Sequence, residues 1–181
     1  MNDFASGEAF TTSTPGYLAF ITWDNTSLYL GVQGTDIAAN SSTKWVLVYL
    51  GGAAGTTNGF PYNNQQPQLP FLAKYHFRWR TDSFISARVF NGTAWVDPGT
   101  GSGNFVRTGS FLEWRIPFAN IGAPSEFGVH ISMINEAGGT EWSYAAVPSN
   151  SFVDGYDPDY SKYFHFDLSS ASAPNSYPPL P

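Results

Sequence analysis

The segment spanning residues 17–36 constrains the fold most, because two runs of alternating apolar residues flank a short polar stretch. Side chains of a β-strand alternate between its two faces. One face of the first run carries Tyr17, Ala19, Ile21 and Trp23. The second run repeats the pattern with Leu28, Leu30 and Val32, and polar residues 24–27 lie between the runs. This arrangement predicts a β-hairpin.

Similar segments recur along the chain, and they predict strands over residues 44–50, 73–80, 84–90, 93–96, 111–116, 127–135, 140–147 and 163–168. Residues 44–50 are almost entirely apolar, which predicts a central strand buried on both faces. Pro117 ends the strand before it, and one helical turn is expected over 118–122. About ten short strands without an amphipathic helix predict an all-β fold, an antiparallel β-sandwich or jelly roll.

One connection stands apart from this pattern. Residues 51–72 show no strand periodicity, and loops of that length are commonly functional. The segment is therefore the first place where a binding site is expected.

The length of 181 residues predicts a single domain over residues 1–168, followed by a Pro/Ser-rich linker or tail over 169–181. Only 12% of residues are charged and 17% are aromatic, a mixture that suits an extracellular β-protein. The net charge of −6, with scattered basic residues, argues against nucleic acid as a partner. Neither a membrane span nor a signal peptide is recognisable. We interpret the chain as one module of a larger secreted or cell-surface protein, with neighbouring modules as partners.

Four segments, in this order, resemble the family 9 carbohydrate-binding modules and the wider DOMON-like sandwich group: residues 16–36, 44–50, 111–122 and 127–142. The resemblance extends over residues 16–168. It implies a sandwich that holds the end of a sugar chain between aromatic rings, with polar side chains on the hydroxyls and calcium stabilising loops. Matching positions assign Asn135, Glu136 and Trp142 to the binding site, with Trp142 as the platform. Because Lys44 stands where the family has an acidic residue, the ligand preference is not carried over.

The chemistry of sugar recognition points to similar residues. Pyranose rings stack their C–H groups on aromatic faces, and their hydroxyls need amide, carboxylate or guanidinium partners. The segment 51–72 offers such a mixture in Phe60, Tyr62, Asn63, Asn64 and Gln65. The alternative is an ordered surface loop without a ligand. By contrast, Trp23, Trp45 and Trp114 lie in strongly apolar strands and are expected to be buried.

Other residues are candidate ligands for a metal ion or a haem. Asp154, Asp157 and Asp159 gather three carboxylates in a short loop, and such oxygen ligands suit calcium. A solvated acidic turn is the alternative interpretation. Some DOMON-type sandwiches bind haem through a Met and a His, a role open here to Met133 with His130 or His165.

No catalytic motif is recognisable. The resemblance to the family 9 modules implies a non-catalytic carbohydrate-binding module. Such a module would tether a secreted enzyme or a surface protein to a polysaccharide or oligosaccharide. Two alternatives remain open. One is a self-associating structural module of a surface layer, adhesin or fibre, and the other is a haem-binding domain.

Overall fold

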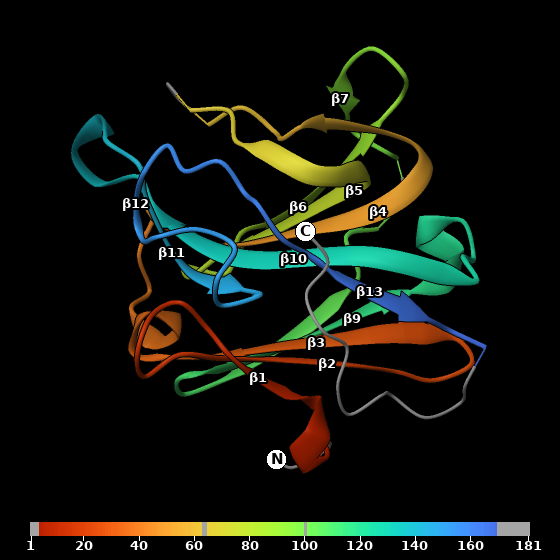
Figure 1. Ribbon diagram of the computed structural model, residues 1–181. Coiled ribbons are helices and arrows are strands. Elements are labelled where there is room, and N and C mark those ends of the chain that lie inside the picture. The colour runs from red at the N-terminus through yellow and green to blue at the C-terminus, as the bar shows by residue number, and fades with distance from the viewer. Residues whose placement is uncertain (1–3, 63–64, 100, 170–181) are drawn as a thin grey trace.

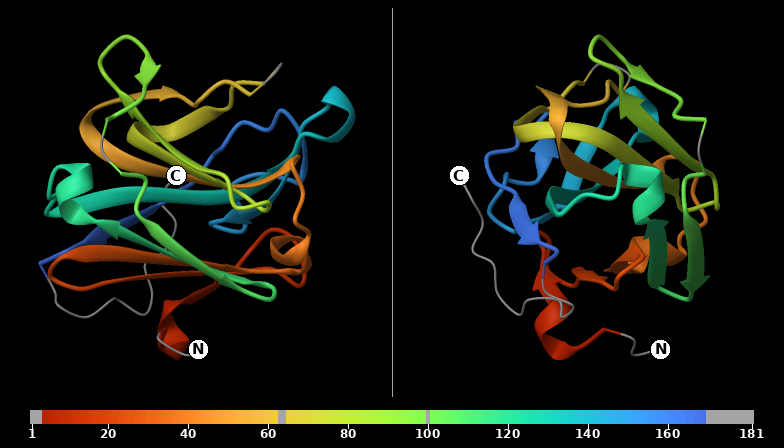
Figure 2. Two further views of the ribbon diagram at one scale, coloured as in Figure 1. Left: turned by 180° about the vertical axis from the view of Figure 1, so that it is seen from behind. Right: turned by 90° about the vertical axis from the view of Figure 1, so that its right-hand side faces the viewer.

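Two antiparallel sheets lie face to face in the computed structural model, which describes residues 4–62, 65–99 and 101–169 (Figure 1). Within these residues, one sheet has five strands in the order β1 (Ala9–Thr11), β2 (Leu18–Trp23), β3 (Ser27–Gln33), β9 (Phe111–Pro117) and β8 (Asn104–Thr108). The other has eight: β12 (Gly155–Tyr156), β11 (Trp142–Val147), β10 (Glu126–Asn135), β4 (Lys44–Asn58), β5 (Gln68–Arg80), β6 (Ile85–Phe90) and β7 (Trp95–Val96), with β13 (Phe164–Asp167) paired to β10. The predicted antiparallel β-sandwich is confirmed, and Figure 2 shows its two layers from behind and from the side.

The strand count in the described residues exceeds the predicted ten because β1, β8 and β12 are also present. They are short or carry few apolar residues, so they give little periodic signal. The helical turn predicted after Pro117 is the 3-10 helix η3 (Phe118–Ile121). The other 3-10 helices in the described chain are η1 (Ser6–Glu8), η2 (Thr35–Ala38) and η4 (Ala137–Gly139). None of the described helices has the length and apolar character needed to cross a membrane.

The core follows from the alternation in the strands. The apolar face of the β2–β3 hairpin packs into one buried cluster with the inward side chains of β4, β5, β9 and β10. β4 is buried on both faces between residues 45 and 50, as predicted. Its inward residues Val46 and Val48 join the core between the sheets, while Leu47 is buried on the opposite side. We call that opposite side, which points away from the five-stranded sheet, the outer face.

The prediction of a loop without strand periodicity over residues 51–72 is wrong at both ends. β4 continues to Asn58 and β5 begins at Gln68, so the connecting loop shrinks to residues 59–67. Gly51 and Thr56 both oppose Ala73, so the ladder contains a bulge. Glycine, alanine and asparagine are depleted in strands. Their abundance in the segment conceals an extension that forms because β4 and β5 pair with each other.

Candidate functional site

Four side chains form a row across the eight-stranded sheet at one end of the sandwich: Lys44 on β4, Asn135 on β10, Trp142 on β11 and Tyr156 on β12. Each lies directly opposite the next in the strand register. Directly opposed residues of antiparallel strands project to the same face. The adjacent row belongs to the core between the sheets: Val46, Met133 and Tyr144. The outermost row therefore faces the other sheet just beyond the core, where the sandwich opens.

A cavity of about 280 Å³ opens at this end, and we call it the end pocket. It is lined by seven residues from both sheets and their connections: Thr14, Tyr17, Asp36, Asn135, Trp142, Tyr144 and Asp154. Tyr17 directly precedes β2, and Asp36 lies in η2, which follows β3. The five-stranded sheet thus supplies one wall of the end pocket through the segments at the ends of its hairpin.

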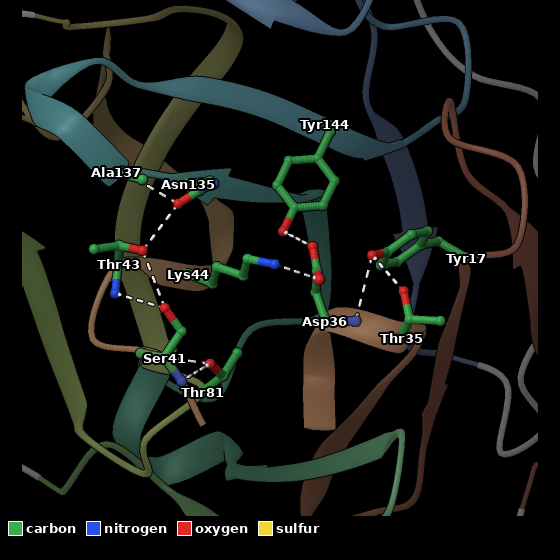
Figure 3. A network of polar contacts seen from close by, with 10 residues as sticks. All are labelled: Tyr17, Thr35, Asp36, Ser41, Thr43, Lys44, Thr81, Asn135, Ala137 and Tyr144. Atoms are coloured by element: carbon green, nitrogen blue, oxygen red, sulfur yellow. Dashed lines mark hydrogen bonds and ion pairs between the residues drawn. The ribbon is translucent and has the colours of Figure 1, made fainter. Parts of the chain in front are cut away.

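The carboxylate of Asp36 is held from both sides (Figure 3). Lys44 Nζ donates to Asp36 Oδ1 over 2.5 Å, and the Tyr144 hydroxyl donates to Asp36 Oδ2 over 2.8 Å. Burial raises the pKa of Asp36, but the hydrogen bonds from Lys44 and Tyr144 outweigh it and hold the pKa below its ordinary value. Burial and the bond to Asp36 also raise the pKa of Tyr144, which keeps its hydroxyl a donor. The result is a fixed, ionised carboxylate in the wall of the pocket.

Two hydrogen bonds to its side-chain carbonyl oxygen orient Asn135. Asn135 Oδ1 accepts hydrogen bonds from Thr43 Oγ1 at 2.9 Å and from the backbone N–H of Ala137 at 3.1 Å (Figure 3). No hydrogen bond to another described residue uses Asn135 Nδ2. Because an amide nitrogen carries two donor hydrogens, Asn135 presents an oriented and unused donor to the end pocket.

Trp142 and Tyr156 form an aromatic platform at the edge of the end pocket. Trp142 is 42% exposed and Tyr156 is 62% exposed, values that are unusual for large rings in a folded core. Their ring centroids lie 4.9 Å apart at an interplanar angle of 89°, an edge-to-face contact. The contact orients the Trp142 ring while much of its surface stays open to solvent.

Glu136 lies elsewhere, although the sequence groups it with Asn135 and Trp142. Its Oε2 accepts a 2.6 Å hydrogen bond from the indole N–H of Trp45. The side chain of Trp45 belongs to a small buried cluster on the outer face with Leu47 and Ile134. The side chains of the sequence neighbours Asn135 and Glu136 therefore lie on opposite faces of the sheet.

The described residues of the connecting loop, 59–62 and 65–67, pack on the outer face and are not among those that line the end pocket. Tyr62 and Gln65 are buried there; the Tyr62 hydroxyl bonds to His76 Nε2 at 2.9 Å, and Gln65 Nε2 donates to the backbone carbonyl of Glu141. Phe60 is half-buried, with the guanidinium of Arg78 4.7 Å from its ring centroid. These contacts fix the loop and leave little of Tyr62 or Gln65 exposed to a ligand. The predicted site residues Asn63 and Asn64 lie outside the described residues.

The three aspartates proposed for calcium are engaged differently from one another. Asp154 accepts hydrogen bonds from the hydroxyls of Ser13 and Thr14, at 2.5 and 2.6 Å. Asp159 accepts the backbone N–H of Gln68, and Asp157 is exposed with a φ of 44°. Within the described residues, no three acidic, histidine or cysteine side chains are grouped as metal ligands. Calcium binding stays a prediction, without support from these contacts.

The candidate haem ligands do not share a face. Met133 is buried in the core between the sheets. His130, three residues earlier on the same strand, bonds to Ser151 on the outer side, and burial lowers its pKa to about 3. His165 lies opposite Gly128, with its Nε2 3.3 Å from Glu126 Oε2. Residues an odd number apart on a strand project to opposite faces, so Met133 and His130 cannot approach one ligand from the same side.

Sequence reasoning places Trp142 and Asn135 correctly together, but it misses several residues of the end pocket and platform: Thr14, Tyr17, Asp36, Tyr144 and Tyr156. Alternation along residues 142–147 gives a signal for Tyr144, since it shares a face with Trp142. Nothing local in the sequence indicates that η2 brings Asp36 to this end of the sheet.

Comparison of the chain with protein-family models, curated proteins and solved structures finds no match. The resemblance to the family 9 modules therefore remains a prediction from the sequence.

Proposed function

We propose that the protein is a non-catalytic carbohydrate-binding module whose ligand occupies the end pocket and stacks on Trp142. The observation that carries the proposal is the exposed Trp142–Tyr156 platform beside oriented polar groups. A sugar ring offers a C–H face to the platform and hydroxyls to the unused amide N–H of Asn135 and to Asp36. Such a ligand matches both kinds of surface at once.

The charge state of the pocket favours binding over catalysis. A glycosidase needs a carboxylic acid with a raised pKa to protonate the leaving oxygen. Asp36 has the opposite shift, and both of its oxygens already accept hydrogen bonds. Both oxygens of Asp154 are likewise held by the hydroxyls of Ser13 and Thr14. These carboxylates suit fixed acceptors better than a proton donor. Binding would raise the local concentration of an attached enzyme or surface protein at its polysaccharide.

A glycan array and native affinity electrophoresis with soluble glucans, xylans, mannans and galactans test this function. We expect retarded migration on at least one polysaccharide and selective signals on the corresponding array positions. Each assay is repeated with EDTA and with added calcium, so that loss and recovery of binding would support the calcium prediction. A protein that binds none of these glycans, and whose light scattering shows an oligomer that dissociates when Trp142 is replaced, would instead be a self-associating module.

A further inference from the structure

A second cavity, of about 580 Å³, adjoins the end pocket. Asp154 lines both cavities. The other residues around the second cavity are mostly small and polar, among them Ser13, Ser149, Asn150 and Ser161. The end pocket alone falls just below the roughly 300–1,000 Å³ of typical small-molecule sites, whereas the second cavity lies within that range.

Asp154 forms a fixed boundary between the two cavities. Its Oδ1 accepts from Ser13 Oγ, which lines the second cavity, and its Oδ2 accepts from Thr14 Oγ1, which lines the end pocket. Each hydroxyl also accepts a backbone N–H of β11: Ser13 Oγ from Ala146 at 2.8 Å, and Thr14 Oγ1 from Ala145 at 2.7 Å. This bonding fixes the position of the two cavities relative to each other.

The surface beside this boundary is apolar and open. Val153 is 89% exposed, and Tyr156 is 62% exposed, one on each side of Asp154 in the sequence. Exposed apolar surface rimmed by polar groups is typical of interaction sites. Asp154 is the only charged residue among those that line the second cavity in the described chain. This composition suits a ligand that is neutral, hydroxyl-rich and partly apolar.

From this arrangement we infer that the end pocket and the second cavity form one groove, which binds several consecutive sugars in the interior of a neutral polysaccharide chain. This inference rests on the proposed function. A site for the chain end needs one closed subsite, whereas here a cavity about twice as large continues beyond Asp154. In this groove the polysaccharide runs past Trp142 and Tyr156 and then beside Asp154. Its further hydroxyls lie against Asn150 and the serines of the second cavity.

Calorimetry with oligosaccharides of two to six residues tests the groove, using β-1,4-linked glucose, xylose and mannose series and their borohydride-reduced forms. We expect affinity to rise by about tenfold or more between the disaccharide and the hexasaccharide, because added sugars gain hydrogen bonds in the second cavity. Reduction of the chain end is expected to leave the affinity of the hexasaccharide unchanged. Equal affinity for all lengths, or loss of binding on reduction, would show that a single chain-end subsite binds the sugar.

Two variants locate the effect. Asn150→Ala alters an exposed residue that lines only the second cavity, and it should weaken hexasaccharide binding about five- to tenfold while leaving the disaccharide unaffected. Asn25→Ala, in the exposed turn between β2 and β3 at the opposite end of the sandwich, is the matched control and should change neither (Figure 1). An Asn150→Ala protein with unchanged hexasaccharide affinity overturns the groove while the proposed function stands. Failure of every oligosaccharide to bind the unaltered protein overturns both.

Discussion

Replacement of Trp114 by alanine is expected to destabilise the protein by about 3–5 kcal/mol, the loss typical of a large ring deleted from a well-packed core. Trp114 is 1% exposed on β9. It contacts Phe77 of the other sheet edge-to-face, with 5.9 Å between ring centroids. Its indole N–H also donates to the carbonyl of Ser102 at 2.8 Å. The substitution thus opens a cavity between the sheets and leaves an acceptor without its donor.

Urea unfolding followed by circular dichroism measures this loss. Val106→Ala is the control, because Val106 lies on the neighbouring strand β8 and is 61% exposed, so its truncation should change the free energy of unfolding by less than about 0.5 kcal/mol. If Trp114→Ala cost no more than Val106→Ala, the packing of the two sheets through Trp114 would be refuted.

Replacement of Trp142 by alanine is expected to weaken glycan binding by about 10- to 100-fold, or about 1.4–2.8 kcal/mol, as for the loss of an aromatic anchor. The melting temperature should change by no more than about 2 °C, because the ring is 42% exposed and lies at the rim of the sandwich, in edge-to-face contact with the exposed Tyr156. Calorimetry and a thermal melt on the same preparation separate the two effects.

Phe84→Ala is the matched control for this variant. Phe84 is 46% exposed, close to the value for Trp142, but it contacts Trp45 on the outer face. Its replacement should leave glycan affinity unchanged. A Trp142→Ala protein that melts much earlier but binds normally would assign Trp142 to the folded scaffold alone.

The fold is largely predictable from the sequence because alternation reports directly which strand face is buried. Ala19, Ile21 and Trp23 are all buried, as the hairpin pattern predicts. The extension of β4 and β5 is not predictable in this way, because pairing between the two strands, rather than intrinsic propensity, holds Thr56 and Asn58 in the ladder. The predicted linker over 169–181 falls almost entirely outside the described residues.

The site is less predictable because it is assembled from distant segments. Trp142 and Asn135 are recognised within one stretch of sequence, and the register places them opposite each other. Asp36 reaches the same pocket through a hydrogen bond to Tyr144, which is 108 positions away in the chain. The family resemblance groups Glu136 with them, yet its side chain bonds to Trp45 on the other side of the sheet. Local patterns define faces of strands, but they do not define which loops meet at the end of a sandwich.

The most direct measurement of the central claim is a two-dimensional ¹H–¹⁵N NMR titration that follows the indole N–H of each of the six tryptophans. The titrant is the oligosaccharide that binds most tightly in the calorimetric series. The account predicts that the Trp142 resonance shifts saturably while those of the buried Trp79 and Trp114 stay in place. Saturable binding that leaves the Trp142 indole unmoved would contradict it.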